Sequence, residues 1–204
     1  MKILRVTCCL FVLLLSLVAF SFVAVHPAAA QTLNPPPPPE YSCRAGANVT
    51  ICQADATISY GPEDTGIVCG SGPSAFDIFD SGTFKLNVIR FYDQNGNLTR
   101  RVIHDVYTFA QFSNPLTGAV VPYTQQDTIR HVLAVPGDLS SVTETSTGEI
   151  IFKPADGAPV FLNAGRVVTA PDGTIEFRAG PQNFLDYFVN GDTSVIQKLC
   201  AALS

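Results

Sequence analysis

Turn-forming sequences recur at short intervals through most of this chain, and they restrict its possible folds more than any other feature. They are Asn95-Gly96, Thr117-Gly118, Pro136-Gly137-Asp138, Thr147-Gly148, Asp156-Gly157 and Asp172-Gly173. The runs between them are rich in Val, Ile, Phe and Thr and cover residues 83–92, 98–112, 119–135, 140–146, 149–154, 158–169 and 174–178. Strands at this spacing, with no helix between them, form antiparallel meanders. We therefore predict an all-β fold, either a barrel or a sandwich.

The C-terminus departs from this pattern and predicts one helix over residues 192–203. Asp192 is a suitable N-cap residue. Five apolar side chains then fall on one helical face: Val195, Ile196, Leu199, Cys200 and Leu203. We expect this helix to pack on the sheet.

The N-terminus has the three-part layout of a secretory signal. Lys2 and Arg5 precede an uncharged apolar run over residues 10–25, and Pro27-Ala28-Ala29-Ala30 follows it. Small residues at this point are typical of a signal peptidase site. We predict that residues 1–30 are a signal peptide cleaved after Ala30, and that the mature protein is secreted and free of the membrane. An uncleaved anchor helix is the alternative, because the apolar run approaches the length that spans a bilayer.

Cleavage changes the charge of the chain. Lys2 and Arg5 leave, so the 12 basic residues become 10 against 17 acidic residues, which gives a net charge of −7. An acidic surface argues against nucleic acid as a partner, since that affinity depends on many contacts of Lys and Arg with phosphate. The mature length fits one domain, and we expect a monomer.

A proline run divides the mature chain into a linker and a domain. Five consecutive prolines at 35–39 predict a stiff polyproline II segment. We assign residues 31–42 to a Pro-rich linker that holds the domain off the cell surface, and residues 43–204 to the domain.

The cysteines of the mature chain predict two disulfides. Four remain after cleavage: Cys43, Cys52, Cys69 and Cys200. An even number in an exported protein indicates a disulfide framework, with three possible connectivities. We favour a local Cys43–Cys52 bond and a long Cys69–Cys200 bond. A zinc site is the alternative, but the spacing does not fit one.

The turns also predict which side chains face each other across neighbouring strands. If Gly96 closes a three-residue loop and Thr117-Gly118 is a two-residue turn, each strand acquires a fixed register. Leu86, His104 and His131 then form one row on the inner face. Lys85, Asp105 and Arg130 form a row of alternating charges on the opposite face. One apolar and one ion-paired face support this register, since a slip of one residue would exchange the faces.

This register places His104 and His131, the two histidines of the mature chain, side by side. On the same face Arg90 opposes Arg100, with Tyr92 beyond them. The five residues can line a pocket for a small apolar molecule with an anionic head. Two other interpretations remain open: a hydrogen-bonded structural pair, or a metal site with Asp127 as third ligand. We expect no resident metal or cofactor.

The sequence gives little support for catalysis. It contains no GxSxG, HExxH, P-loop or GxGxxG motif. The four cysteines are assigned to disulfides, and Asp105 between Lys85 and Arg130 would have a lowered pKa, which makes it a poor general acid. We leave the catalytic residues unassigned and favour a protein that is not an enzyme.

Three segments resemble uncharacterised exported proteins of Gram-positive-type bacteria. They are Phe91-Tyr92-Asp93-Gln94-Asn95-Gly96-Asn97, Asn163-Ala164-Gly165-Arg166-Val167-Val168 and Leu199-Cys200-Ala201-Ala202-Leu203. The resemblance implies export, one β-rich domain and a terminal cysteine, but no activity. We expect a secreted, non-catalytic module that binds a small molecule or a component of the cell envelope. The alternative is a small barrel enzyme, of cyclase or isomerase type, with His104 or His131 as acid–base.

Overall fold

The computed structural model describes residues 32–153 and 157–204, so the predicted signal peptide, residues 1–30, lies outside the described residues. One antiparallel sheet contains eight strands in sequence order, as predicted for a meander. The strands are β1 (Ser42–Ala45), β2 (Val49–Cys69), β3 (Phe76–Asp93), β4 (Leu98–Ser113), β5 (Val120–Leu133), β6 (Val142–Phe152), β7 (Val160–Thr169) and β8 (Ile175–Ala179). The outer strands β1 and β8 do not pair with each other, so the sheet stays open and is not a barrel.

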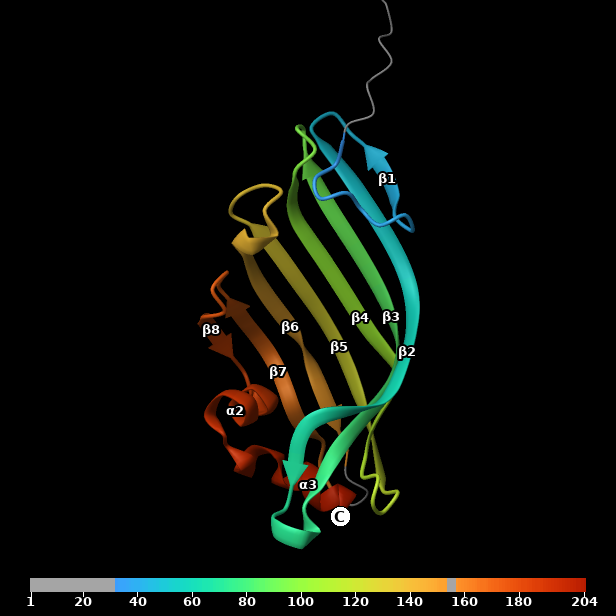
Figure 1. Cartoon of the computed structure of the whole chain (residues 1–204), viewed down its shortest axis with the longest axis vertical. Helices are drawn as coiled ribbons and strands as arrows, with labels where there is room; N and C mark the ends of the chain where they lie inside the picture. Colours follow the sequence, from blue (N-terminus) through green and yellow to red (C-terminus); the bar gives the residue numbers. More distant parts are fainter. Residues whose placement is uncertain (1–31, 154–156) are drawn as a thin grey trace, which may run out of the picture. The chain divides into compact units, whose positions relative to one another are not determined.

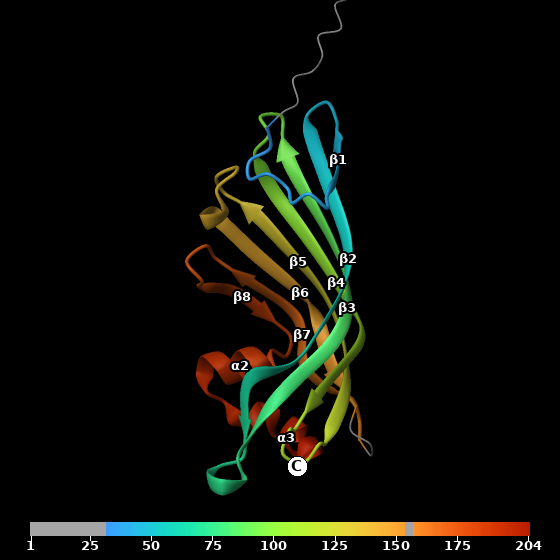
Figure 2. The ribbon, with the colours of Figure 1, turned by 45° about the vertical axis from the view of Figure 1, so that its right-hand side comes forward.

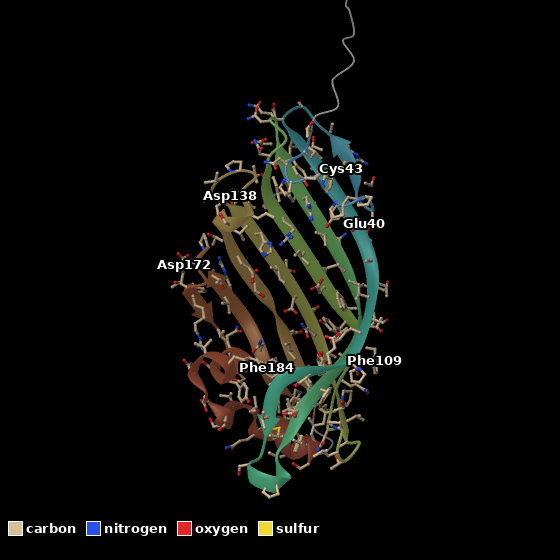
Figure 3. The ribbon with its side chains drawn as sticks, in the orientation of Figure 1. Glu40, Cys43, Phe109, Asp138, Asp172 and Phe184 are labelled. Atoms are coloured by element: carbon tan, nitrogen blue, oxygen red, sulfur yellow. A yellow bond between two sulfur atoms is a disulfide. The ribbon has the colours of Figure 1, made fainter. Side chains whose placement is uncertain are left out.

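Two short helices cover one end of the concave face of this sheet (Figure 1). They are α2 (Asn183–Asn190) and α3 (Gln197–Leu203). Phe184 of α2 points toward the sheet (Figure 3), where its ring meets Phe112 edge-on at a centroid distance of 6.0 Å. The buried core at this end consists of Ile67, Cys69, Ile78, Ala110, Phe112, Val121, Tyr123, Phe152, Leu162, Ile196, Leu199 and Leu203. None of the helices in the described part of the chain is long and apolar enough to cross a membrane.

The C-terminal region differs from the single helix predicted over 192–203. Asp192 does accept a hydrogen bond from the Ser194 amide at 2.9 Å, but the turn that it caps is a short 3₁₀ segment, Thr193–Ile196, which precedes α3. Helix α2 was not predicted. It ends at Gly191, whose φ of +66° is a left-handed conformation that glycine adopts without steric cost.

The predicted linker is part of the fold, which corrects its interpretation as a free spacer. Residues 32–41 lie on the end of the concave face opposite the helices. Asn34 donates from its amide to Gly96 O and accepts from the Leu98 amide, both at 2.8 Å. The Tyr92 hydroxyl donates to Pro35 O at 3.0 Å. The second buried core lies here and contains Cys52, Tyr92, Leu98 and Leu133, with Leu33, Tyr41 and Val142 packed against it.

Two local predictions about strands are wrong. The chain between Val49 and Cys69 forms a 21-residue strand that was not predicted, because its Ser, Gly, Asp and Pro residues hide the alternation. Thr147-Gly148 was predicted as a turn, but β6 runs through it without interruption. Gly148 is required there for a different reason: a Cβ at this position would overlap Asp127 Oδ1 and Gln126 O.

Both predicted disulfides are present. Cys43 and Cys52 face each other on β1 and β2 with a Cα–Cα distance of 4.0 Å. Cys69, at the end of β2, is joined to Cys200 of α3. The first bond fixes the short edge strand, while the second fixes the last helix to the sheet.

The two disulfides are expected to contribute unequally to stability. Cys69→Ser/Cys200→Ser opens a connection with a sequence separation of 131 and should lower the free energy of unfolding by about 5 kcal/mol in the chain-entropy model. Cys43→Ser/Cys52→Ser, with a separation of 9, should lower it by about 2.5 kcal/mol. Denaturant unfolding of both double variants measures the difference. Equal losses would contradict this assignment.

Candidate functional site

The register of β3 against β4 decides which side chains share the concave face. The turn at Asn95-Gly96 forms as predicted: the Asp93 amide donates to Asn97 O at 2.9 Å, and Gly96 has a φ of +83°. Tyr92 pairs with Leu98, but Phe91 pairs with Arg100, so Thr99 is an extra residue in β4. This β-bulge shifts β4 by one residue relative to the prediction as far as Tyr107, where Thr108 is a second extra residue.

The next turn differs as well. Asn114 and Ala119 are joined by a backbone hydrogen bond of 2.9 Å, which makes a four-residue loop instead of a two-residue turn at Thr117-Gly118. A second bulge, at Thr108, then shifts β4 by one more residue, so that Asp105 pairs with Asp127 and His104 pairs with Thr128. The predicted registers of both hairpins are therefore wrong beyond their turns.

The two histidines lie on opposite faces as a result, and the predicted histidine pair is not formed. His131 is buried on the concave face, where its neighbours are Arg101 and Glu144. His104 is exposed on the convex face, where its Nδ1 lies 3.0 Å from Thr128 Oγ1. It lines an open hollow of about 510 Å³ together with Asp55 and other residues of β2, β3 and β4.

The other three predicted site residues also separate. Arg90 is on the concave face but opposes Arg101, not Arg100. Arg100 lies on the convex face with its guanidinium 3.9 Å above the Phe91 ring. Tyr92 is fully buried beneath the docked segment at Pro35.

Between the two cores, the concave face carries three parallel rows of side chains. Each row runs across the sheet and takes one residue from each neighbouring strand. No helix or loop crosses this middle part in either view (Figures 1 and 2). The charged row is Arg90, Arg101, His131 and Glu144. The apolar row is Val88, Ile103 and Ile129, followed by Ser146. The acidic row is Leu86, Asp105 and Asp127, followed by Gly148 and Gly165.

The charged row contains a hydrogen-bonded chain that engages both ring nitrogens of His131. Arg101 donates from Nε and Nη2 to His131 Nδ1 at 2.9 and 2.6 Å. Because Nδ1 accepts these bonds, the ring proton is on Nε2, which donates to Glu144 Oε2 at 2.7 Å. His131 is thereby held in one orientation and one tautomer.

Arg90 and Arg101 place two positive charges directly opposite each other. Both side chains are half-buried, and burial together with the charge of Arg90 lowers the pKa of Arg101. Arg90 packs over the Tyr41 ring at 4.9 Å, and its Nε is buried without a hydrogen bond. Within residues 32–153 and 157–204, neither guanidinium forms an ion pair with a carboxylate. The one acidic side chain in the row, Glu144, is hydrogen-bonded to His131.

The acidic row has a carboxyl pair where the sequence predicted alternating charges. Asp105 faces Asp127 instead of Lys85 and Arg130, so its pKa is not lowered as expected. Burial, and for Asp105 also the charge of Asp127, raises the pKa of both carboxyls. Asp127 Oδ2 accepts from Gln125 Nε2 at 2.5 Å, while Asp105 Oδ1 is buried and has no hydrogen-bond partner among the residues that the structure describes.

A tyrosine–carboxylate cluster closes the concave face toward the helix end. The hydroxyls of Tyr60 and Tyr123 donate to Asp80 at 2.8 and 2.9 Å. Burial raises the pKa of both tyrosines and of Asp80. These three side chains are hydrogen-bonded to one another. The cluster therefore links β2, β3 and β5, and we do not assign it as a binding site.

Neither similarity to known proteins nor metal-ligand geometry assigns a function to this face. No family model, curated protein or solved structure gives a significant match to the chain. Among the residues that the structure describes, no group of three or more His, Cys, Asp or Glu side chains is arranged to hold a metal ion. The predicted third ligand, Asp127, has its backbone oxygen 3.1 Å from His104 Nδ1, while His131 lies on the other face of the sheet from His104.

Sequence reasoning missed Arg101, Glu144 and Asp105 as members of this face. Arg100 and Arg101 are adjacent in sequence, and only the bulge at Thr99 decides which of them points inward. Gly148 was interpreted as a turn signal. It was in fact the available indication that a side chain of another strand, Asp127, lies against β6.

The two histidines are expected to respond differently to substitution. His131→Phe removes the partner of Arg101 and Glu144 inside the sheet and should lower the free energy of unfolding by about 1–3 kcal/mol. His104→Phe is the matched control on the convex face and should change it by no more than about 0.5 kcal/mol. Chemical denaturation compares the two, and similar losses would contradict the face assignment.

The carboxyl pair is expected to make stability depend on pH. Since the folded-state pKa values of Asp105 and Asp127 are raised above 3.8, the folded protein retains protons that the unfolded chain releases. The contribution of this pair to stability should therefore fall as the pH rises from about 3.8 through the folded-state values, and stay lowered at neutral pH. Asp105→Asn should raise the neutral-pH free energy of unfolding by about 0.5–1 kcal/mol, because it removes a like-charge pair.

Unfolding measured across this pH range tests the prediction. Asp55→Asn, which removes a carboxyl from the convex face of β2 and leaves the Asp105–Asp127 pair intact, is the control. An Asp105→Asn variant that is less stable than the native protein at neutral pH, with an unchanged slope, would refute it.

Proposed function

We propose that this protein is a secreted, non-catalytic binding module that holds a small amphiphilic molecule on its concave face. The anionic head group of the ligand would lie against Arg90 and Arg101. The observation that carries this proposal is the direct opposition of two half-buried guanidiniums, neither of which is ion-paired to a carboxylate in the described part of the chain.

Two facing arginines repel each other, and an anion between them removes this repulsion. Guanidinium groups recognise carboxylate and phosphate through paired N–H donors. Arg90 Nε is buried and has no hydrogen-bond partner among the described residues, so its N–H is an unsatisfied donor. His131 fixes the Arg101 side chain from one side, which reduces the entropy lost when a ligand binds.

The apolar and acidic rows beside the arginines suit a ligand that has an apolar body and a polar group at the end opposite its anionic head. Val88, Ile103 and Ile129 form the adjacent row. Asp105 lies four residues from Arg101 along β4, a distance of about 13 Å in an extended strand. Gly148 and Gly165 continue the acidic row on β6 and β7 without side chains, and Asp127 and the Ala179 carbonyl lie close against them. A hydroxyl or amine at the far end of the ligand would meet the carboxyl pair.

Export is supported by the disulfides, which are typical of oxidising compartments. A histidine acid–base, the basis of the alternative enzyme hypothesis, gains no support from the geometry. Both ring nitrogens of His131 are engaged, and His104 is on the other face. A binding role therefore fits the concave face better than catalysis.

Binding of decanoate and of uncharged decanol, measured by calorimetry, tests the proposal. Decanoate should bind more tightly than decanol, and Arg90→Gln or Arg101→Gln should each weaken decanoate binding about tenfold while leaving decanol unchanged. Arg100→Gln is a matched control, since it removes the neighbouring positive charge from the convex face, and it should have little effect. Equal loss in the Arg100 variant, or equal affinity for decanoate and decanol, would contradict the assignment.

A further inference from the structure

Strand β2 has a long edge that no other strand covers. β1 pairs with only four of its residues, Thr50–Gln53. From Ala54 to Tyr60, β2 pairs with β3 on one side and, within the described residues, with no strand on the other. Figure 1 shows this part of β2 at the margin of the sheet, below β1.

This edge lacks the features that normally prevent strands from pairing between molecules. Its seven residues are in unbroken register with β3. They include no Lys, Arg or Pro, and Asp55 is their one charged residue. Exposed edges of this kind are templates for an additional strand. The opposite edge, β8, has five residues and ends at Gly180-Pro181, which cannot extend it.

The Cys43–Cys52 pair identifies the backbone groups that point outward. A Cα–Cα distance of 4.0 Å marks a non-hydrogen-bonded pair of an antiparallel ladder, so the next pair, Ser42 with Gln53, exchanges hydrogen bonds. Because the pattern alternates, Asp55, Thr57 and Ser59 direct their N–H and C=O groups away from β3. Nothing in the described backbone bonds to them from that side.

We propose that a second copy of this chain pairs with this edge, antiparallel to it, around a two-fold axis at Thr57. Thr57 would then face Thr57 of the second copy, and Asp55 would face its Ser59. These three pairs exchange about six backbone hydrogen bonds. We choose a second copy as the partner because this edge is complementary to itself. When two copies pair around Thr57, each outward N–H of one copy meets an outward C=O of the other, and the two Asp55 charges stay apart.

The side chains agree with this arrangement. On the concave side, Ala56 meets Ile58 of the second copy, and the exposed Ile58 side chain loses contact with water. On the convex side, the central pair is two β-branched threonines, which are favourable strand residues. The dimer replaces the monomer expected from sequence, and it is independent of ligand binding at the charged row.

Charge substitutions at Thr57 provide a sharp test, because this residue faces itself across the axis. Thr57→Lys and Thr57→Glu each place like charges opposite one another, and each should weaken the dimer at least about fivefold. An equimolar mixture should recover a dimer with one copy of each. Thr57→Val keeps the shape without a charge and is the control. Thr57→Pro, which removes only an outward N–H, should abolish the dimer while the sheet still folds.

Sedimentation velocity over a concentration series measures all five proteins, with thermal unfolding as the check on folding. A native dimer that the Pro variant abolishes and the Lys–Glu mixture restores supports the proposal. A native chain that remains monomeric at about 100 µM overturns it. So does a native dimer that persists in the folded Pro variant, since its contact would lie elsewhere on the surface.

Discussion

The extra residue at Thr99 is the constraint on which the arrangement of the concave face depends. Side chains alternate between the faces of a sheet, so one inserted residue sends the following side chains of β4, as far as the second bulge at Thr108, to the opposite side. Arg101, Ile103 and Asp105 point inward because of it, while Arg100 and His104 point outward. The four-residue loop after Asn114 and a second bulge of β4, at Thr108, together set the register of β5, which brings His131 to Arg101 and Asp127 to Asp105.

The concave face is stabilised at both ends and polar in the middle. Helices α2 and α3 cover one end, and the proline-containing segment 32–41 covers the other. The buried apolar residues lie mainly in these two cores, so the middle of the face is free to carry groups that oppose stability. Two facing arginines and two facing aspartates are such groups, and a structure selected for stability alone would replace them. Their presence favours a role in binding.

Sequence patterns predicted the features that depend on local chemistry. Val- and Thr-rich runs between turn residues predicted the antiparallel meander, Asn95-Gly96 predicted its hairpin, and the cysteine count led to both disulfides. The patterns failed where a distant contact decides the outcome. Gly148 was interpreted as a turn because its contact with Asp127 comes from another strand. β2 was missed because its pairing with β3 outweighs its turn-like composition. Which residues belong to the site depends on the register of the strands. That register depends on bulges, and a single sequence gives no reliable signal for a bulge.

The bond between Cys69 and Cys200 has a consequence for how the molecule survives damage. It joins the second strand to the last helix and encloses six of the eight strands in one covalent ring. A protease that cuts the exposed loop at Leu116 would divide the chain into two pieces of comparable size, yet Cys69 lies in the first and Cys200 in the second. The halves would stay joined, with β4 and β5 still paired. A single cut would then nick the protein without dismantling it, which suits the extracellular location proposed above.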